Sequence, residues 1–191
     1  MASCFRLCLI SVWRWIDPIY FACTRLSYLA QDDGDPVFRV RLAKYKGPDR
    51  TLTDGVKIRR NDLLVKIHLH NAKLLRELCA NGNDLMKGRL LYQRILQAMP
   101  YLASHVSRHK KSDKIKGIIG VTLLSRSSDR LGFDSFPIQS RAYLAMKSLT
   151  CYPIFWLSTR RPFKRKHRKL VPKYLFMSKE TLLNMYTPES R

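Results

Sequence analysis

The chain has 191 residues, a length that suits one domain or one domain with appended segments. Its composition is 46% apolar and 26% charged, which is typical of a globular protein and excludes a chain that is disordered throughout. The chain carries 36 Lys and Arg against 14 Asp and Glu, a formal charge of +22. Such an excess indicates an anionic partner, and composition leaves three classes open: nucleic acid, an acidic membrane surface and an anionic polymer.

Cysteine usage and hydropathy bear on the compartment. The five cysteines are scattered and form no CxxC pair, so we expect reduced thiols rather than a disulfide framework or a zinc knuckle. No apolar run approaches the roughly 20 residues of a membrane-spanning helix. Arg14 and Asp17 interrupt the N-terminal apolar run, which argues against a cleaved signal peptide. We therefore expect a cytoplasmic protein, at most peripheral at the inner face of the membrane.

Residues 1–29 are predicted to form an amphipathic N-terminal segment, because their polar side chains fall on one narrow side of a helical wheel. Asp17-Pro18 predicts the end of this helix or a kink in it, followed by a second short helical segment from Ile19 to Leu29. Two interpretations remain open. The segment either covers a sheet as part of the core or anchors the protein to a membrane, with Trp13 and Trp15 in the interface.

Residues 30–150 are expected to form an α+β core that starts after the polar break at 31–36. Strands are predicted where apolar and polar residues alternate, or where nearly all residues are apolar: near 38–45, 51–58, 63–70 and 115–124. Asp54-Gly55 predicts a type I′ hairpin turn. Gly117 and Gly120 weaken a strand and thus indicate the close approach of a helix or a ligand.

Helices are predicted between and after these strands, with Asn71 and Asp84 as N-caps and Ser178 at the start of a short terminal helix. Pro100 is expected to open a separate helical turn that runs through Val106. The predicted helices are 72–79, 85–98, 142–149 and 181–185. The resulting fold class is α+β, with a small mixed or antiparallel sheet covered by helices on one face.

Four histidines supply the candidates for metal chemistry. His68 and His70 share a face of a predicted strand, and His105 and His109 share a helix face. The two pairs would assemble a zinc site if that helix packed on that strand face. A polar strand face and a solvated helix end explain the same residues, so we expect no metal and no cofactor.

An enzymatic reading has little support in the sequence. The chain contains no nucleophile elbow, P-loop or dinucleotide-binding motif. An enzyme acting on a sugar-type substrate would centre on His68, Asn71 and Asp62, at a pocket near one end of the strand 63–70. We keep this as a second alternative, since the spacing of these residues does not by itself favour catalysis.

Residues 151–191 form an aromatic and basic C-terminal segment that we expect to pack on the core. The residues from Ser135 to Lys179 contain no acid, and aromatic residues flank a dense basic cluster within them. The predicted anion-binding residues are Arg160, Arg161, Lys164, Arg165, Lys166, Arg168 and Lys169. Cations beside aromatics are typical both of nucleic-acid surfaces and of membrane-surface segments, in which Trp156 would join the interface.

Several stretches, taken in chain order, carry a family resemblance: 38–47 (FRVRLAKYKG), 52–55 (LTDG), 61–62, 64–71 (LVKIHLHN), 117–124, 130–133 (RLGF) and 172–186 (PKYLFMSKETLLNMY). Together they resemble the YkoP-like domain family of Bacillus-type bacteria, from about Trp13 to Tyr186. The resemblance implies a poorly characterised family whose domains occur alone or joined to polysaccharide deacetylases. It also implies a His-Leu-x-Asn pattern, which maps here to His68, Leu69 and Asn71, with His70 at the variable position.

We therefore expect a non-catalytic accessory module that binds the cytoplasmic membrane surface or an anionic polymer of the cell envelope. The basic cluster would supply the cations, and Trp13, Trp15 and Trp156 would anchor the chain. By resemblance, its partners include enzymes of envelope polysaccharide metabolism. The first alternative is a nucleic-acid-binding protein that uses the basic cluster at 160–173.

Overall fold

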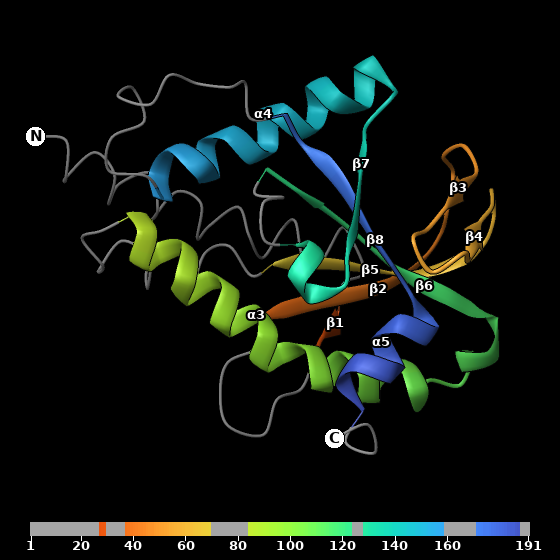
Figure 1. Cartoon of the computed structure of the whole chain (residues 1–191). Coiled ribbons are helices and arrows are strands. Elements are labelled where there is room, and N and C mark those ends of the chain that lie inside the picture. The colour runs from red at the N-terminus through yellow and green to blue at the C-terminus, as the bar shows by residue number, and fades with distance from the viewer. Residues whose placement is uncertain (1–26, 30–36, 70–83, 124–127, 159–170, 188–191) are drawn as a thin grey trace, which may run out of the picture.

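The computed structural model describes residues 27–29, 37–69, 84–123, 128–158 and 171–187. Within these ranges the chain forms a mixed six-stranded sheet, a separate two-stranded hairpin and three α-helices (Figure 1). This confirms the predicted α+β class. The elements are β1 (Ser27–Tyr28), β2 (Phe38–Lys44), β3 (Arg50–Thr51), β4 (Lys57–Ile58), β5 (Leu63–Leu69), α3 (Asp84–Ser107), β6 (Ile115–Thr122), β7 (Asp134–Pro137), α4 (Arg141–Ser158), β8 (Lys173–Ser178) and α5 (Lys179–Tyr186), with 3-10 turns η1 (Ser112–Lys114) and η2 (Asp129–Leu131).

The strand order in the large sheet is β1-β2-β5-β6-β8-β7. Only β5 and β6 run parallel, and every other neighbouring pair is antiparallel. The nearly all-apolar strand β6 lies inside the sheet, as its sequence predicts. At Gly117 a Cβ atom would meet the backbone carbonyl of Met177 on β8, so the glycine permits these two strands to approach closely.

One face of the sheet packs against α3 and α5. Phe38, Val65 and Ile118 point to this side, where they contact buried residues of α3 such as Leu102 and, from α5, Leu182. Burial of these side chains stabilises α3 as a single helix in spite of Pro100. The expected separate turn after Pro100 is therefore wrong, because the apolar face of the helix continues through the proline.

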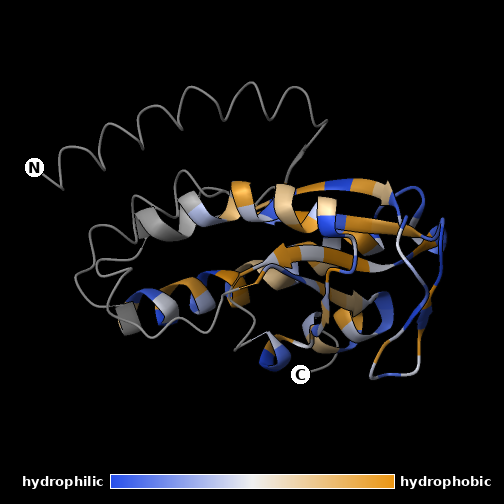
Figure 2. Cartoon of the chain, turned by 90° about the horizontal axis from the view of Figure 1, so that it is seen from above, coloured by the Kyte–Doolittle hydropathy of each residue, from blue (hydrophilic) through white to orange (hydrophobic). Residues whose placement is uncertain are grey.

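The opposite face of the sheet is covered by α4 and by the β3–β4 hairpin. Figure 2 shows α3 and α4 on either side of the strands. The Tyr143 ring of α4 stacks on Tyr174 of β8 with 5.8 Å between centroids. Helices therefore cover both faces rather than the one face that we expected. Beside α4, the hairpin closes a second apolar cluster formed by Tyr45, Leu52, Ile58, Leu64, Ile119 and Phe176.

The hairpin forms where Asp54-Gly55 predicts one, but with another turn. A type I′ turn needs positive φ at both central residues, whereas Gly55 is left-handed (φ 84°) and Asp54 is not. The Gly55 N–H donates to the carbonyl of Leu52, and the Leu52 N–H donates to that of Val56. This is a three-residue loop with glycine at the left-handed position, a form in which Asp54 is free to bond elsewhere with its carboxylate.

The two segments that flank the predicted core each contribute a strand to the large sheet. Ser27 and Tyr28 form strand β1 beside β2 rather than the end of a helix, because an edge of the sheet is open to them. Residues 173–178 form β8, which lies between β6 and β7, so this part of the C-terminal segment is inside the sheet. The rest of the N-terminal segment and the predicted helix 72–79 lie outside the described residues.

Candidate functional site

Basic side chains gather on the α4 side of strands β2 and β5. Antiparallel pairing places Arg39 directly opposite His68 and Arg41 directly opposite Lys66. Their apolar neighbours in the strands point to the α3 side, so alternation puts all four of these residues on the other face. The helix α4 adds Lys147, whose charge acts on both Lys66 and His68. We call these five residues the basic sheet face.

The basic sheet face is largely withdrawn from water. Arg39 is only 4% exposed, and the other four residues are half-buried. A buried cation is stable only where hydrogen bonds or opposite charge replace the water that it has lost. Like charges that face each other across two strands also destabilise a sheet. Arg41 and Lys66 are such a like-charged pair, because they lie directly opposite each other in β2 and β5.

Burial, together with the mutual repulsion of these groups, changes their protonation. Burial, followed by the charges of Lys147 and Arg41, lowers the pKa of Lys66 to about 8. Burial, followed by the charges of Lys66 and Lys147, lowers the pKa of His68 to about 3. At neutral pH Lys66 is mostly charged and His68 is neutral. The face thus offers cations together with one imidazole that both donates and accepts.

In the part of α4 whose side chains the structure describes, polar groups lie toward the sheet. Tyr143, Lys147 and Cys151 are spaced by four residues and are half-buried. The Lys147 ammonium lies 5.6 Å from the centre of the Tyr143 ring. Burial, followed by Tyr143, raises the pKa of Tyr174, which lies under this side of the helix.

The exposed side of α4 is an apolar stripe. Leu149 is 77% exposed, Met146 50% and Tyr152 41%. Ala142 and Ala145, one turn earlier, are also exposed. We call these five residues the outer stripe of α4. In this part of α4 the usual polarity of a surface helix is reversed, because Lys147 is half-buried against the sheet while Met146 and Leu149 are exposed.

The structure does not bring together the residues of the sugar-enzyme alternative. Asp62 precedes β5, and its carboxylate accepts a hydrogen bond from the Arg59 N–H at 2.7 Å within a turn. His68 lies near the other end of that strand, roughly 20 Å away at the rise of a β-strand. Asn71 lies outside the described residues.

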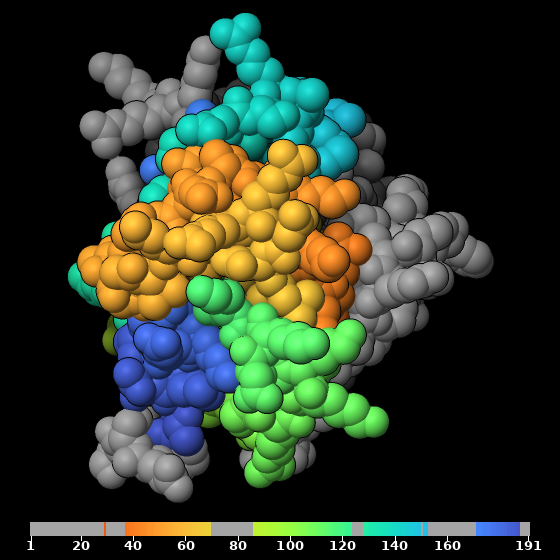
Figure 3. Space-filling view, turned by 90° about the vertical axis from the view of Figure 1, so that its right-hand side faces the viewer, coloured from red at the N-terminus to blue at the C-terminus, as the bar shows by residue number. Residues whose placement is uncertain are grey.

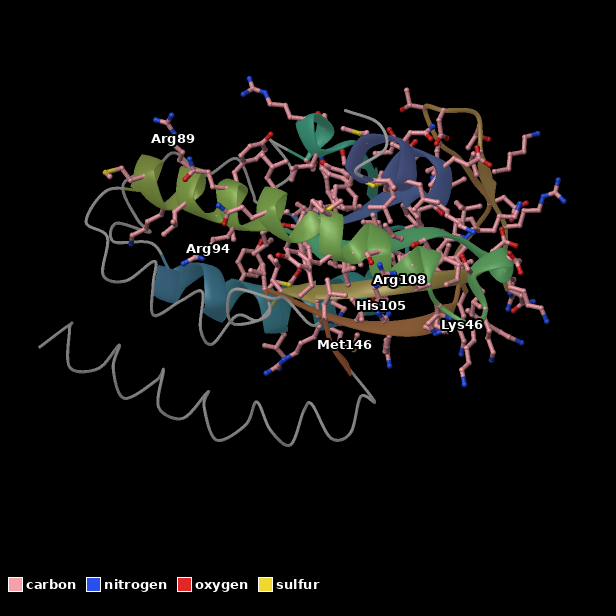
Figure 4. All side chains as sticks on the ribbon, turned by 90° about the horizontal axis from the view of Figure 1, so that it is seen from below. Lys46, Arg89, Arg94, His105, Arg108 and Met146 are labelled. Atoms are coloured by element: carbon pink, nitrogen blue, oxygen red, sulfur yellow. The ribbon has the colours of Figure 1, made fainter. Side chains whose placement is uncertain are left out.

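The histidine pairs are also separated. The rings of His105 and His109 lie 5.9 Å apart at the C-terminal end of α3. That helix covers the face of the sheet opposite to the face that carries His68. Figure 4 shows His105 and Arg108 on the α3 side, and Met146 of α4 on the other side of the sheet. Burial, followed by His109, lowers the pKa of His105. Among the residues that the structure describes, no group of three potential ligands is placed to hold a metal, and His70 lies outside them.

The remaining predicted residues lie mostly outside the described ranges. These are Trp13, Trp15 and the seven cations of the basic cluster, whereas the backbone of Trp156 is part of α4. Within the described ranges no helix is both long enough and apolar enough to cross a bilayer.

Sequence reasoning missed the basic sheet face, although part of its signal was visible. Alternation in 38–45 and in 63–70 marks Arg39, Arg41, Lys66 and His68 as the polar sides of two strands. Neither strand reveals its partner or its register, and nothing in 142–149 shows that Lys147 faces inward. The sequence signal for the basic sheet face is that the polar residues of both strands are all basic.

Comparison with known proteins gives a consistent result. A family model described as the YkoP domain matches residues 6–186. The chain is 48% identical over 183 residues to a protein of Bacillus subtilis (strain 168) described as "Uncharacterized protein YkoP", and the match covers 95% of this chain and 97% of that protein. No solved structure matches the chain significantly.

Proposed function

This chain belongs to the YkoP domain family, and on that premise we propose that it is an accessory module that attaches peripherally to an anionic membrane surface. The proposal retains the accessory role in cell-envelope polysaccharide metabolism that the family resemblance implies. The observation that carries it is the outer stripe of α4.

The chemistry of the stripe favours a lipid surface over nucleic acid. Exposed Met, Leu and Tyr side chains lose their contact with water when a helix lies in the interface of a bilayer. The aliphatic side chains of Met146 and Leu149 do nothing for binding to phosphates in water. Burial of Leu149 and Met146 would contribute about 1.5–3 kcal/mol for each side chain.

Charge complementarity favours an anionic surface. The stretch from Ser135 to Lys179, which includes α4, contains eleven Lys and Arg and no acid. Cations near an anionic bilayer contribute about 1 kcal/mol each. Apolar insertion together with basic attraction supplies the two signals that stable peripheral attachment requires.

The test is co-sedimentation of the full chain with vesicles of phosphatidylglycerol and phosphatidylcholine. The double variant Met146→Ser/Leu149→Ser should lower vesicle binding at least about tenfold, since it removes apolar area that would enter the bilayer. The control is Met86→Ser, because Met86 is a methionine of α3 that is 60% exposed. Equal binding by the double variant and the control would refute the proposal.

A further inference from the structure

The register of β2 and β5 concentrates positive charge in one small area. Arg39 lies opposite His68. Two residues further along β2, on the same face of the sheet, Arg41 lies opposite Lys66. Directly opposed residues have Cβ atoms about 5 Å apart, and residues two apart along a strand are separated by roughly 7 Å. Four side chains therefore point out of an area that one small ligand can span.

The fifth member comes from another layer of the fold. Lys147 of α4 acts by charge on Lys66 and His68 from across the interface between helix and sheet. On its other side the same helix turn exposes Met146 and Leu149. A ligand on the basic sheet face would therefore sit between the sheet and the helix, just under the outer stripe.

We propose that the basic sheet face binds a phosphate-type anion. A phosphate group has several oxygens and up to two negative charges, so it can contact two guanidinium groups and two ammonium groups together. The neutral His68 imidazole can donate one hydrogen bond to it. The half-buried setting suits a single phosphate group, whereas a nucleic-acid duplex requires an open surface.

The electrostatics of the face agree with this assignment. The pKa of Lys66 is lowered by its burial and by two positive neighbours, Lys147 and Arg41. A bound anion would reverse that effect and hold the lysine in its charged form. Binding should therefore weaken as the pH rises above about 8, where the unliganded Lys66 loses its proton.

The first test measures thermal unfolding of the full chain in inorganic phosphate and in chloride at equal ionic strength and pH 7. Phosphate at about ten times its dissociation constant should raise Tm by about 3 °C over chloride. The variant Lys66→Met should lose this response, and the control Lys116→Met, at an exposed lysine of the neighbouring strand β6, should retain it.

A second readout separates a ligand-binding role from a structural one. In chloride, Lys66→Met should unfold at a higher temperature than the wild type, because it removes one of the opposed like charges. A residue needed only for structure would lower Tm. Absence of any phosphate response in the wild type would overturn the proposal. This is the result expected if one of the chain's own carboxylates neutralises the face. An equal response in both variants would overturn it too.

Vesicle binding distinguishes the two sources of the phosphate group. If Lys66→Met also weakens binding to phosphatidylglycerol vesicles, the anion is a lipid headgroup, and the inference then rests on the proposed membrane attachment. If vesicle binding is unchanged while the phosphate response is lost, the site takes a soluble phosphate compound. The Met146→Ser/Leu149→Ser variant should keep the phosphate response, so failure of the membrane proposal would leave this inference standing.

Discussion

At the scale of single residues, the half-buried bases beneath α4 control how stability depends on pH. His68 has its pKa lowered to about 3 by burial and by Lys66, Lys147, Arg41 and Arg39. In the unfolded chain its pKa returns to about 6.5. Between these values the unfolded state binds more protons than the folded state, so the free energy of unfolding falls as the pH falls.

We expect His68→Gln to reduce this acid sensitivity. From pH 6.5 to pH 4 the wild type should lose about 2 kcal/mol more stability than the variant, because glutamine does not titrate. Urea unfolding at several pH values measures the difference, with His109→Gln as the control. Parallel pH profiles for the wild type and His68→Gln would show that His68 is not buried in its neutral form.

Lys66 responds in a different pH window. Its folded pKa is about 8 and its reference pKa is 10.5. Between these values the unfolded chain holds the proton and the folded chain does not, so stability rises with pH. After allowance for solvent screening, we expect a gain of about 1 kcal/mol from pH 8 to pH 10. Lys66→Met should lack that gain in the same unfolding measurements, and a full gain in the variant would assign it to other groups.

At the scale of elements, one docked hairpin closes the end of the sheet. The Asp54 carboxylate accepts a hydrogen bond from the Thr181 hydroxyl of α5 at 2.7 Å, and Asp134 of β7 accepts one from the Thr53 N–H at 2.8 Å. Figure 3 shows the orange and yellow part of the chain, which includes the hairpin, next to the blue C-terminal part that includes α5. Burial raises the pKa of Asp54, but hydrogen bonds, first those from Ser178 and Thr181, lower it by more than burial raises it. The pKa of Asp54 is therefore below its usual value.

We expect Asp54→Asn and Thr181→Val each to lower the free energy of unfolding by about 1 kcal/mol at pH 7. The two losses should not add in full, because Thr181→Val removes the hydrogen bond that Asp54→Asn weakens by making its acceptor neutral. Chemical unfolding of the two single variants and the double variant measures this, with Asp113→Asn as a control at an exposed aspartate of η1. Additive losses would show that the two side chains act independently.

The elements that sequence patterns predicted are those with a local periodic signal. Alternation identified β2 and β5, and the apolar run identified β6. The strand β8 was missed, because its sequence KYLFMS follows a basic run and half of its apolar residues lie on each face of an inner strand. Ser178 was identified as the start of α5, and its hydroxyl accepts from the Thr181 N–H.

The candidate site was less accessible to sequence reasoning than the strands that carry it. Alternation assigns Arg41 and Lys66 to polar sides, but only the register of two distant segments makes them neighbours. The inward direction of Lys147 depends on how α4 docks. Contacts between segments far apart in the chain decide both features, and a single sequence does not report them.

At the scale of the whole molecule, charge is unevenly distributed. Asp49, Asp54, Asp62 and Asp134 accept hydrogen bonds within the hairpin or next to it. The stretch from Ser135 to Lys179, which includes α4, contains no acid. A protein of net charge +22 with this asymmetry would approach an anionic surface with α4 and its outer stripe rather than with the hairpin.

The most direct measurement is co-sedimentation of the full chain with anionic and neutral vesicles over a salt series, with duplex DNA as a competitor. We predict binding to anionic vesicles that weakens with salt but partly survives at high salt, because apolar insertion is not screened. Binding should remain when DNA is present. Absence of vesicle binding together with steeply salt-dependent DNA binding would contradict membrane attachment and favour a nucleic-acid partner.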